Sequence, residues 1–269
     1  MRIISMNFED YKTLLFKRDG PVLTITLNRP EQLNAVDSLM HAELAHVFYD
    51  VASDIDSEII ILTGAGRAFS AGGDFKWFQT MIDQPLVWEK TRIEAKQIIF
   101  GLLDCEKPII AKVNGHAMGL GATIALFCDI IFAANRSKIG DPHVNVGMVA
   151  GDGGAIIWPQ LIGYARAKEY LFTGKPILAT DAANIGLINY AIPPETLDAA
   201  VTTFVNQLAK GAMQSIRYTK VSVNIGLKQL SSSILDASLA FESLTNSSAD
   251  HQEAVNAFLA KRIPKFTGK

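Results

Sequence analysis

Two short and almost entirely apolar runs constrain the fold of this chain more than any other feature. The first, EIIILTG, covers residues 58–64, and the second, KPIIAKVNG, covers residues 107–115. Each run ends in glycine, and a stretch with helical periodicity follows each of them. A third run, CDIIFAA, has the β-branched character of a buried strand. Strands that alternate with helices at this spacing are typical of crossover α/β units, so we predict an α/β fold.

The segments before these runs predict a hairpin and a helix. Two alternating segments between Thr13 and Asn28 are joined at Asp19-Gly20-Pro21, which is a hairpin signal. Asp37 or Ser38 is expected to cap a helix that reaches about Val51, with Leu39, Leu44 and Val47 on its apolar side. A further helix is expected from roughly Val87 to Leu103.

The second half of the chain is mostly helical in pattern. A short strand is predicted near Leu187–Ile192, and from about Thr196 to Lys261 only helical periods occur. We therefore predict an α/β core over residues 1–198 and a helical region over residues 199–269. The tail has more apolar positions than a free-standing segment should expose, which favours packing on the core or on another subunit. These positions are Leu235, Leu239, Phe241, Val255 and Phe258.

The charge balance and the cysteines exclude several classes of function. With 25 Lys+Arg against 27 Asp+Glu, the chain has no basic field that would attract nucleic acid or an anionic membrane. The most apolar stretch, Ala117 to Ala134, is interrupted by glycines and by Asp129, which disfavours a membrane span. The N-terminus does not resemble a signal peptide. Cys105 and Cys128 lack CxxC spacing, so we expect buried thiols and a cytoplasmic protein.

Two strand ends run into glycine-rich loops that are candidates for chemistry. They cover Gly64–Asp74 and Asn114–Gly121. Glycine lets a backbone approach a ligand closely, and the start of a helix offers unpaired N–H groups. Two such loops side by side can point two N–H donors at one oxygen, as in an oxyanion hole. Tight turns are the alternative for either loop alone. Neither loop has the GK[ST] or GxGxxG pattern of phosphate and dinucleotide sites.

RAFSAGGDF and KPIIAKVNGHAMGLGATIALFCDI resemble the two signature segments of the crotonase superfamily, the enoyl-CoA hydratase/isomerase family. The resemblance extends to LTITLNRPEQLNAV and FTGKPILATDAANIGLINYAI and thus covers most of the chain. It implies a crotonase-type spiral of ββα units with a C-terminal helical trimerisation region, and a homotrimer or dimer of trimers. It also implies a CoA thioester substrate, no prosthetic group, and an oxyanion hole made by the amides of Gly73 and Leu120.

The chain departs from the family where hydratases carry two catalytic glutamates. By the resemblance, these positions are Thr123 and His143. A threonine hydroxyl is a poor acid or base, so we expect Thr123 to be structural or to hold a water. An imidazole has an unperturbed pKa of about 6.5, which suits proton transfer near neutral pH. We therefore predict that His143 is the acid/base.

Asp152 follows His143 within the segment DPHVNVGMVAGDGG. In some branches of the superfamily, such as the dienoyl-CoA isomerases and dihydroxynaphthoyl-CoA synthases, a catalytic aspartate stands at this position. The segment leaves a strand-like stretch, turns and enters a helix at Gly153–Gly154, so both side chains are expected to face the oxyanion pocket. A helix cap is the structural alternative for Asp152.

The pairing of His143 with Asp152 also resembles the branch that hydrolyses carbon–carbon bonds of cyclic β-diketones. That branch shares the pattern DPHVNVGMVAGDG…IIWPQLIG and a downstream acid that matches Glu242 in SLAFES. A histidine oriented by a carboxylate can take a proton from water, and the hydroxide can attack a ketone in the oxyanion hole. For Glu242 the sequence slightly favours the alternative of a solvated helix residue.

The C-terminal segment AVNAFLAKRIPKFTGK indicates a CoA substrate instead. It resembles the segment whose Phe and Lys contact CoA in hydratases, matching Phe258 and Lys261, whose spacing would place both on one helix face. Ala71 and Asp74 of the signature loop complete the implied CoA contacts. A plain amphipathic helix is the alternative. We therefore favour an acyl-CoA enzyme that adds water or moves a proton, with a β-dicarbonyl hydrolase and a non-catalytic binding protein as alternatives.

The remaining histidines do not predict a metal site. His41 and His46 are five residues apart, a spacing that does not put two ligands on one helix face, and His116 and His251 lie in separate segments. The aromatic and methionine side chains after the first loop favour a core or a lid over an acyl chain. These are Trp77, Phe78, Met81 and Trp88.

Overall fold

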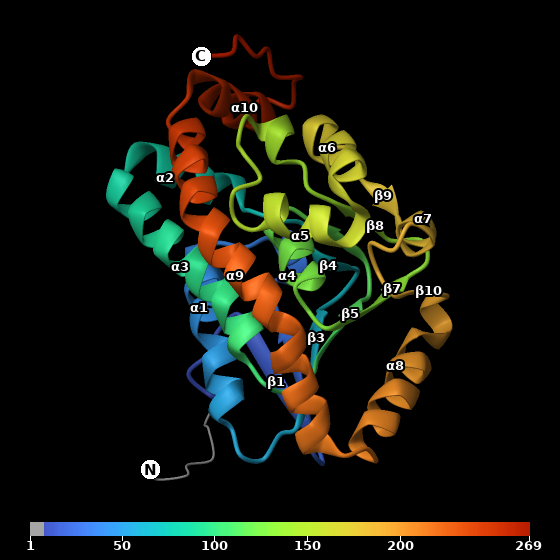
Figure 1. Cartoon of the computed structure of the whole chain (residues 1–269). Coiled ribbons are helices and arrows are strands. Elements are labelled where there is room, and N and C mark those ends of the chain that lie inside the picture. The colour runs from blue at the N-terminus through green and yellow to red at the C-terminus, as the bar shows by residue number, and fades with distance from the viewer. Residues whose placement is uncertain (1–7) are drawn as a thin grey trace.

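The computed structural model describes residues 8–269 and has a parallel sheet with an antiparallel hairpin at its edge. The hairpin turns at Gly20, whose φ of +54° is in the left-handed region that favours glycine. The sheet has the order β1-β2-β3-β5-β7-β10 (Figure 1). Its strands are β1 (Leu14–Asp19), β2 (Val22–Leu27), β3 (Ile59–Gly64), β5 (Ile109–Val113), β7 (Ile130–Ala134) and β10 (Tyr190–Ile192). The predicted hairpin, the three buried runs and the late strand are all confirmed.

A second, smaller sheet positions the glycine-rich loops. It has the order β4-β6-β8-β9, formed by β4 (Ala68–Ser70), β6 (His116–Met118), β8 (Lys138–Gly140) and β9 (Ile177–Leu178). Strands β4 and β6 are parallel, with Ser70 paired to Ala117, so the loops that follow them leave the sheet side by side. These strands were not predicted, because two or three residues are too few to show an alternating pattern.

The first helices cover one face of the large sheet. Helix α1 (Ser38–Ser53) is capped by Asp37, whose carboxylate accepts a hydrogen bond from the Met40 amide, as predicted. It packs against α3 (Pro85–Asp104). The placement of Leu39 on the apolar side was wrong. Its side chain is 48% exposed, because it lies one position off the buried stripe that includes Met40 and Leu44.

The region before α3 forms an additional helix. Helix α2 (Phe75–Asp83) starts directly after Asp74, which caps it, and Pro85 then begins α3 two residues earlier than expected. Shorter elements complete the core: the 3-10 helices η1 (Pro30–Gln32) and η2 (His143–Val146), and helices α4 (Leu120–Leu126), α5 (Gly154–Ile162), α6 (Tyr164–Thr173) and α7 (Ala179–Asn184). The predicted entry into a helix at Gly153–Gly154 is confirmed.

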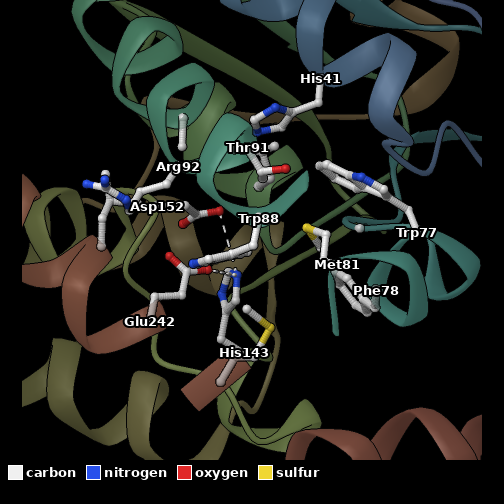
Figure 2. Close-up of a pocket in the computed structure, with 15 residues that line it drawn as sticks. His41, Trp77, Phe78, Met81, Trp88, Thr91, Arg92, His143, Asp152 and Glu242 are labelled. Carbon is white, nitrogen blue, oxygen red and sulfur yellow. Dashed lines mark ion pairs between the residues drawn. The ribbon is translucent and has the colours of Figure 1, made fainter. Parts of the chain in front are cut away.

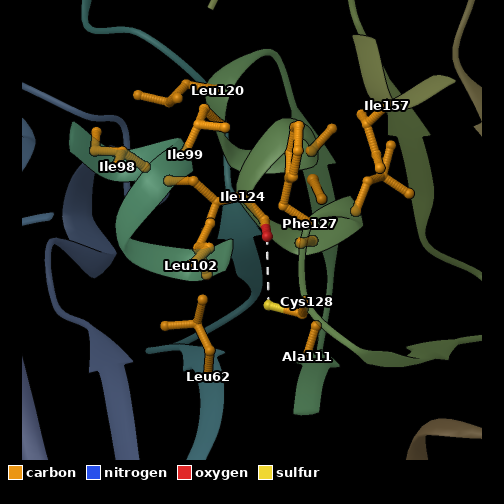
Figure 3. Close-up of a cluster of buried hydrophobic side chains, with 14 of the residues drawn as sticks. Leu62, Ile98, Ile99, Leu102, Ala111, Leu120, Ile124, Phe127, Cys128 and Ile157 are labelled. Carbon is orange, nitrogen blue, oxygen red and sulfur yellow. Dashed lines mark hydrogen bonds between the residues drawn. The ribbon is translucent and has the colours of Figure 1, made fainter. Parts of the chain in front are cut away.

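The helix α4 is the centre of the apolar core. All its side chains are buried, and it lies between α3 and α5 (Figure 3). Leu62 of β3 and Ala111 of β5 contribute to the same cluster. The thiol of Cys128 donates to the carbonyl oxygen of Ile124 at 3.3 Å, and both cysteines are free and buried, as expected.

The C-terminal helices fold back over the core of the same chain. They are α8 (Pro194–Ala209), α9 (Met213–Asn246) and α10 (Ala249–Leu259). The predicted domain boundary at 198/199 lies inside α8. Helix α9 runs along α3 (Figure 1), and α10 packs on α2 and η2.

The apolar residues of the C-terminal region that were predicted to pack on the core or on another subunit fall into two sets. Leu235, Leu239 and Val255 are no more than 1% exposed, so they pack on the core of their own chain, which is one of the two predicted outcomes. Phe241 and Phe258 are 59% and 55% exposed. Within residues 8–269, no helix combines the length and apolarity needed to cross a membrane. Residues 1–7, which carry much of the expectation about a signal peptide, lie outside the described part.

Candidate active site

The two glycine-rich loops meet where β4 and β6 end. Gly72 has a φ of +88° and Gly119 a φ of +51°, and a Cβ atom on either would lie 3.7 Å from the Cα of the other. The amides of Gly73 and Leu120 follow these glycines, and neither donates a hydrogen bond to another residue among 8–269. Leu120 is the first residue of α4, so its amide has no acceptor within the helix. Two unpaired amides therefore border one point, as an oxyanion hole requires.

Gly73, Leu120 and His143 line a single cavity of about 50 Å³ (Figure 2). A buried water needs about 10–15 Å³ of such space, so the cavity can hold a few waters, and a larger ligand requires its wall to move. The wall is aromatic and apolar on one side, with Trp77, Phe78, Met81, Trp88 and Leu239. Its polar members include His41, Thr91, Arg92, His143, Asp152 and Glu242. The residues expected to form a core or lid thus border the cavity.

His143 lies at the centre of the polar side. Its Nδ1 contacts Oδ1 of Asp141, two residues earlier, where the chain leaves β8 and turns into η2. Its Nε2 lies 3.6 Å from Oδ2 of Asp152 and 4.0 Å from Oε1 of Glu242 (Figure 2). Asp152 was predicted to orient the ring, and Asp141 was not predicted to take part. The structure gives the Nδ1 contact to Asp141 and leaves Asp152 facing the other nitrogen.

Glu242 is buried, contrary to the alternative of a solvated helix residue. It reaches the cavity from α9, and its side chain is 5% exposed. Thr123 is also buried, and its hydroxyl donates to Oδ1 of Asp152 at 3.4 Å, so it positions the carboxylate. The predicted His143, Asp152 and Glu242 are therefore brought together beside the predicted Gly73 and Leu120.

Two glycines of the GDGG segment leave room for the carboxylates. A Cβ atom on Gly151 would lie 2.6 Å from Oε2 of Glu242, and a Cβ atom on Gly154 would overlap Oδ2 of Asp141. Neither glycine has a positive φ, so the backbone would accept another residue at both positions. Glycine is required here for space and not for conformation.

The acidic groups raise the proton affinity of the site. Burial lowers the pKa of His143, but the charges of Asp141 and Asp152 outweigh burial and raise the pKa well above its ordinary value. Burial and then the charge of Asp152 raise the pKa of Glu242 well above its usual range. Burial also raises the pKa of Asp152, against the opposing charge of His143. These groups interact strongly and titrate as a unit, so the cluster retains exchangeable protons near neutral pH.

A second imidazole–carboxylate pair, which was not predicted from the sequence, adjoins the cavity through His41. Nδ1 of His41, on α1, is 2.8 Å from Oε2 of Glu94, on α3. Both residues are buried, and the ring of Trp77 packs against His41 with a centroid distance of 5.0 Å. The only sequence signal was the spacing of His41 from Leu44 and Phe48, which puts a polar ring on the inward face of α1.

The residues expected to contact CoA have mixed surroundings. Ala71 is exposed, and Asp74 caps α2 and pairs with Arg29 at 3.2 Å. Phe258 stacks on Phe75 with ring centroids 3.5 Å apart. Lys261 lies beyond the end of α10 with a φ of +53°, so the prediction that it shares a helix face with Phe258 was wrong.

A metal ion could draw ligands from Asp141, His143 and Asp152, whose ligand atoms lie within 4.8 Å of one another. However, Asp141 engages Nδ1 and Asp152 faces Nε2, on opposite edges of the ring. An imidazole placed between two carboxylates suits the holding and transfer of a proton better than three ligands around one ion.

Comparison with known proteins agrees with this geometry. The family model described as enoyl-CoA hydratase/isomerase matches residues 17–269. The chain belongs to this family. The crotonase-type fold is shared with a solved enoyl-CoA hydratase/isomerase from Mycobacterium paratuberculosis, at a TM-score of 0.88 and 35% identity, covering 92% of this chain and 99% of that one.

Two other relatives of this family member differ in activity. A short-chain-enoyl-CoA hydratase from Clostridium acetobutylicum is 33% identical, over 94% of this chain and 97% of the relative. A solved β-diketone hydrolase from the cyanobacterium Anabaena, bound to (S)-3-oxocyclohexyl acetic acid, is also 33% identical, with a TM-score of 0.83 over 89% of this chain and 96% of that one. Overall similarity alone therefore does not separate the two reactions.

Proposed function

We propose that this family member hydrolyses a carbon–carbon bond of a β-dicarbonyl compound. The observation that carries the proposal is the position of Glu242, buried beside His143 and Asp152 in the cavity bordered by the Gly73 and Leu120 amides. These three side chains are the ones by which the sequence resembles the β-diketone hydrolases. The solved β-diketone hydrolase of similar fold supports the same reaction class.

The reaction follows from the placement of donors and bases. One carbonyl oxygen of the substrate accepts hydrogen bonds from the amides of Gly73 and Leu120. Nε2 of neutral His143 takes a proton from a water molecule, and the hydroxide attacks the carbonyl carbon to give a tetrahedral oxyanion. Collapse of the oxyanion breaks the bond to the α-carbon and releases a carboxylic acid and an enolate. The proton then passes from His143 to the α-carbon, so one water is consumed and no redox change occurs.

The three carboxyl groups, Asp141, Asp152 and Glu242, stabilise the protonated forms that occur during the reaction. Asp141 accepts from Nδ1 and fixes the ring, as the aspartate of a Ser-His-Asp triad does. Asp152, at 3.6 Å from Nε2, stabilises the imidazolium that forms when water is deprotonated. Glu242, whose pKa is raised by burial and by Asp152, provides a protonated carboxyl beside the enolate. A positioned base contributes about 10²–10⁴-fold and each oxyanion donor about 10²–10³-fold in rate.

Hydration or proton transfer on an acyl-CoA is the second candidate. The family and the Clostridium hydratase favour it, and Asp152 with Glu242 provides a carboxyl pair that can act as acid and base. In this case Ala71, Asp74, Phe258 and Lys261 are the proposed CoA contacts. A non-catalytic binding protein is the third candidate, and the four titratable groups around the cavity count against it.

Assembly and location also belong to this proposal. We propose a homotrimer or a dimer of trimers in the cytoplasm, with no nucleic acid or membrane partner. The exposed Phe241 and Phe258 of the C-terminal helices support a subunit interface. Light scattering at micromolar concentration tests the assembly, and a clean monomer would exclude it.

A substrate panel in ¹⁸O-labelled water separates the candidates. The panel contains cyclic and linear β-diketones, β-ketoacyl-CoA and enoyl-CoA, and products are identified by mass spectrometry. We expect ring-opened keto acids carrying one ¹⁸O in the new carboxylate, and no such product from the matched His143→Gln variant. Turnover of enoyl-CoA alone would overturn the hydrolase proposal in favour of the acyl-CoA reaction.

A further inference from the structure

His41 occupies a position where packing alone would favour an apolar side chain. It lies on the inward face of α1 with Met40, Leu44 and Phe48, and its side chain is only 3% exposed. Burial of an imidazole costs free energy unless the ring has polar partners. Its presence beside the cavity therefore requires a compensating contact.

Glu94 provides one half of that contact. Burial raises the pKa of Glu94, but the hydrogen bond and charge of His41, with a smaller effect of Lys90, lower it below its ordinary value. An ionised carboxylate can only accept a hydrogen bond, so Nδ1 of His41 is the donor in the 2.8 Å contact. Nε2 is then the nitrogen left for a ligand, and it forms no hydrogen bond with any residue in the range 8–269.

A single ligand in the cavity could contact both His41 and the reacting groups around His143. His41 and His143 both line it, and in Figure 2 they lie at opposite ends of the drawn set, with Met81 and Trp88 between them. Thr91, next to His41 in the wall, already donates its hydroxyl to the carbonyl oxygen of Val87 at 2.8 Å. A ligand oxygen that reaches this end of the cavity therefore meets two polar groups without a partner among residues 8–269, Nε2 of His41 and Nε1 of Trp77.

We propose that His41, held by Glu94 and carrying a proton on each ring nitrogen, donates a hydrogen bond from Nε2 to the second oxygen of the β-dicarbonyl substrate while the first oxygen lies in the oxyanion hole. This inference rests on the proposed function. A β-dicarbonyl carries two oxygens, and in a closed apolar cavity the second would lose its water without replacement. A site that hydrogen-bonds both oxygens selects against ketones that have only one. His41 is thus a binding and specificity residue, and Glu94 positions it.

The test compares a dione with a ketone that lacks the second oxygen. Steady-state hydrolysis of cyclohexane-1,3-dione is measured for wild type, His41→Phe, His41→Gln and Glu94→Gln, with cyclohexanone as a competitive inhibitor of each. His46→Phe, on the exposed side of the same helix, is the matched control. Loss of one hydrogen bond should raise KM for the dione about 10-fold in His41→Phe, with little change in kcat. The inhibition constant of cyclohexanone should stay the same.

The outcomes separate this inference from the function on which it rests. Wild-type enzyme that hydrolyses no β-dicarbonyl would end both. If the wild type is active, an unchanged KM in His41→Phe, or an equal weakening of cyclohexanone and dione, would overturn the role of His41 and leave the hydrolase intact. A loss of kcat alone would likewise exclude a binding role. If the Phe variant does not fold, Glu94→Gln provides the KM comparison, because it removes the charge that holds the His41 ring, and KM for the dione should rise in it too. His41→Gln keeps an N–H donor and should raise KM less than His41→Phe.

Discussion

The Asp141→Asn substitution tests whether Asp141, and not Asp152, orients His143 and sets its proton affinity. Asparagine keeps the shape of the side chain and an oxygen that can accept a hydrogen bond from Nδ1 of His143. It removes the negative charge of a side chain that is only 1% exposed. The substitution also leaves the imidazolium that forms during the reaction without its nearest negative charge. Because the amide keeps part of the contact, we expect kcat to fall by at least about 100-fold, or about 2.7 kcal/mol. The corresponding substitution in a serine protease triad costs about 10⁴-fold, which is the expected upper limit.

The pKa of His143 determines in which direction the pH profile of activity should move. Burial lowers the pKa of His143, and the charges of Asp141 and Asp152 raise it above its ordinary value. The neutral base is the active form, so wild-type activity should rise with pH through a limb above the usual histidine range. Asp141→Asn removes one of the raising charges, so the limb should move to lower pH while the plateau falls.

Two measurements check the reasoning. The first is kcat/KM against pH on the best substrate, and the second is an NMR titration of the ¹⁵N-labelled imidazole. Asp181→Asn, an exposed aspartate on α7, is the control and should leave both profiles unchanged. A limb that stays in place or moves to higher pH, with a normally folded variant, would show that Asp141 does not set the proton affinity of His143.

Three further predictions address the rest of the site. His143→Ala should lower kcat by roughly 100-fold or more with little change in KM, and near wild-type turnover of a folded variant would exclude His143 as the base. The pKa of Glu242 is raised by burial and Asp152, so the folded state binds an extra proton and loses stability as pH rises above the unfolded pKa of about 4.3. Glu242→Gln should therefore gain in Tm relative to wild type at pH 8 but not at pH 4, whereas exposed Glu195→Gln should show no such trend; parallel Tm curves would contradict this. Lys261→Ala should weaken acyl-CoA binding in calorimetry only if the second candidate reaction is correct, and no affinity of wild type for CoA thioesters would remove that candidate.

The sequence could predict the elements that are long enough to carry a pattern. The runs around Ile60 and Ile110 are buried strands because their apolar character is continuous, and Asp37 caps α1 because its side chain reaches the nearby Met40 amide. The loops with Gly73 and Leu120 were found from their glycines and from the family motifs. The strand pairing of Ser70 with Ala117, which brings those loops together, involves too few residues to be visible in a sequence.

The composition of the acidic cluster could be predicted only in part. Asp141 is two residues from His143, but its contact with Nδ1 depends on the 3-10 turn η2, which has no strong sequence signal. Glu242 follows about a hundred positions later, and only the path of α9 across α3 and α5 shows that it is buried. His41 and Glu94 come from two helices whose packing no local pattern encodes.

Gly151 and Gly154, where a side chain would clash with the acids, affect how related sequences should be interpreted. A single methyl group at position 154 would compete with Asp141 for the same volume, and one at position 151 would compete with Glu242. An alanine there would disturb the proton-holding groups although every acid and the imidazole remained in the sequence. A chain that carries the histidine and all the acids but an alanine at either position should therefore not be assigned this chemistry from those side chains alone. Glycine at positions 151 and 154 is therefore as informative for assigning this chemistry as the acids themselves.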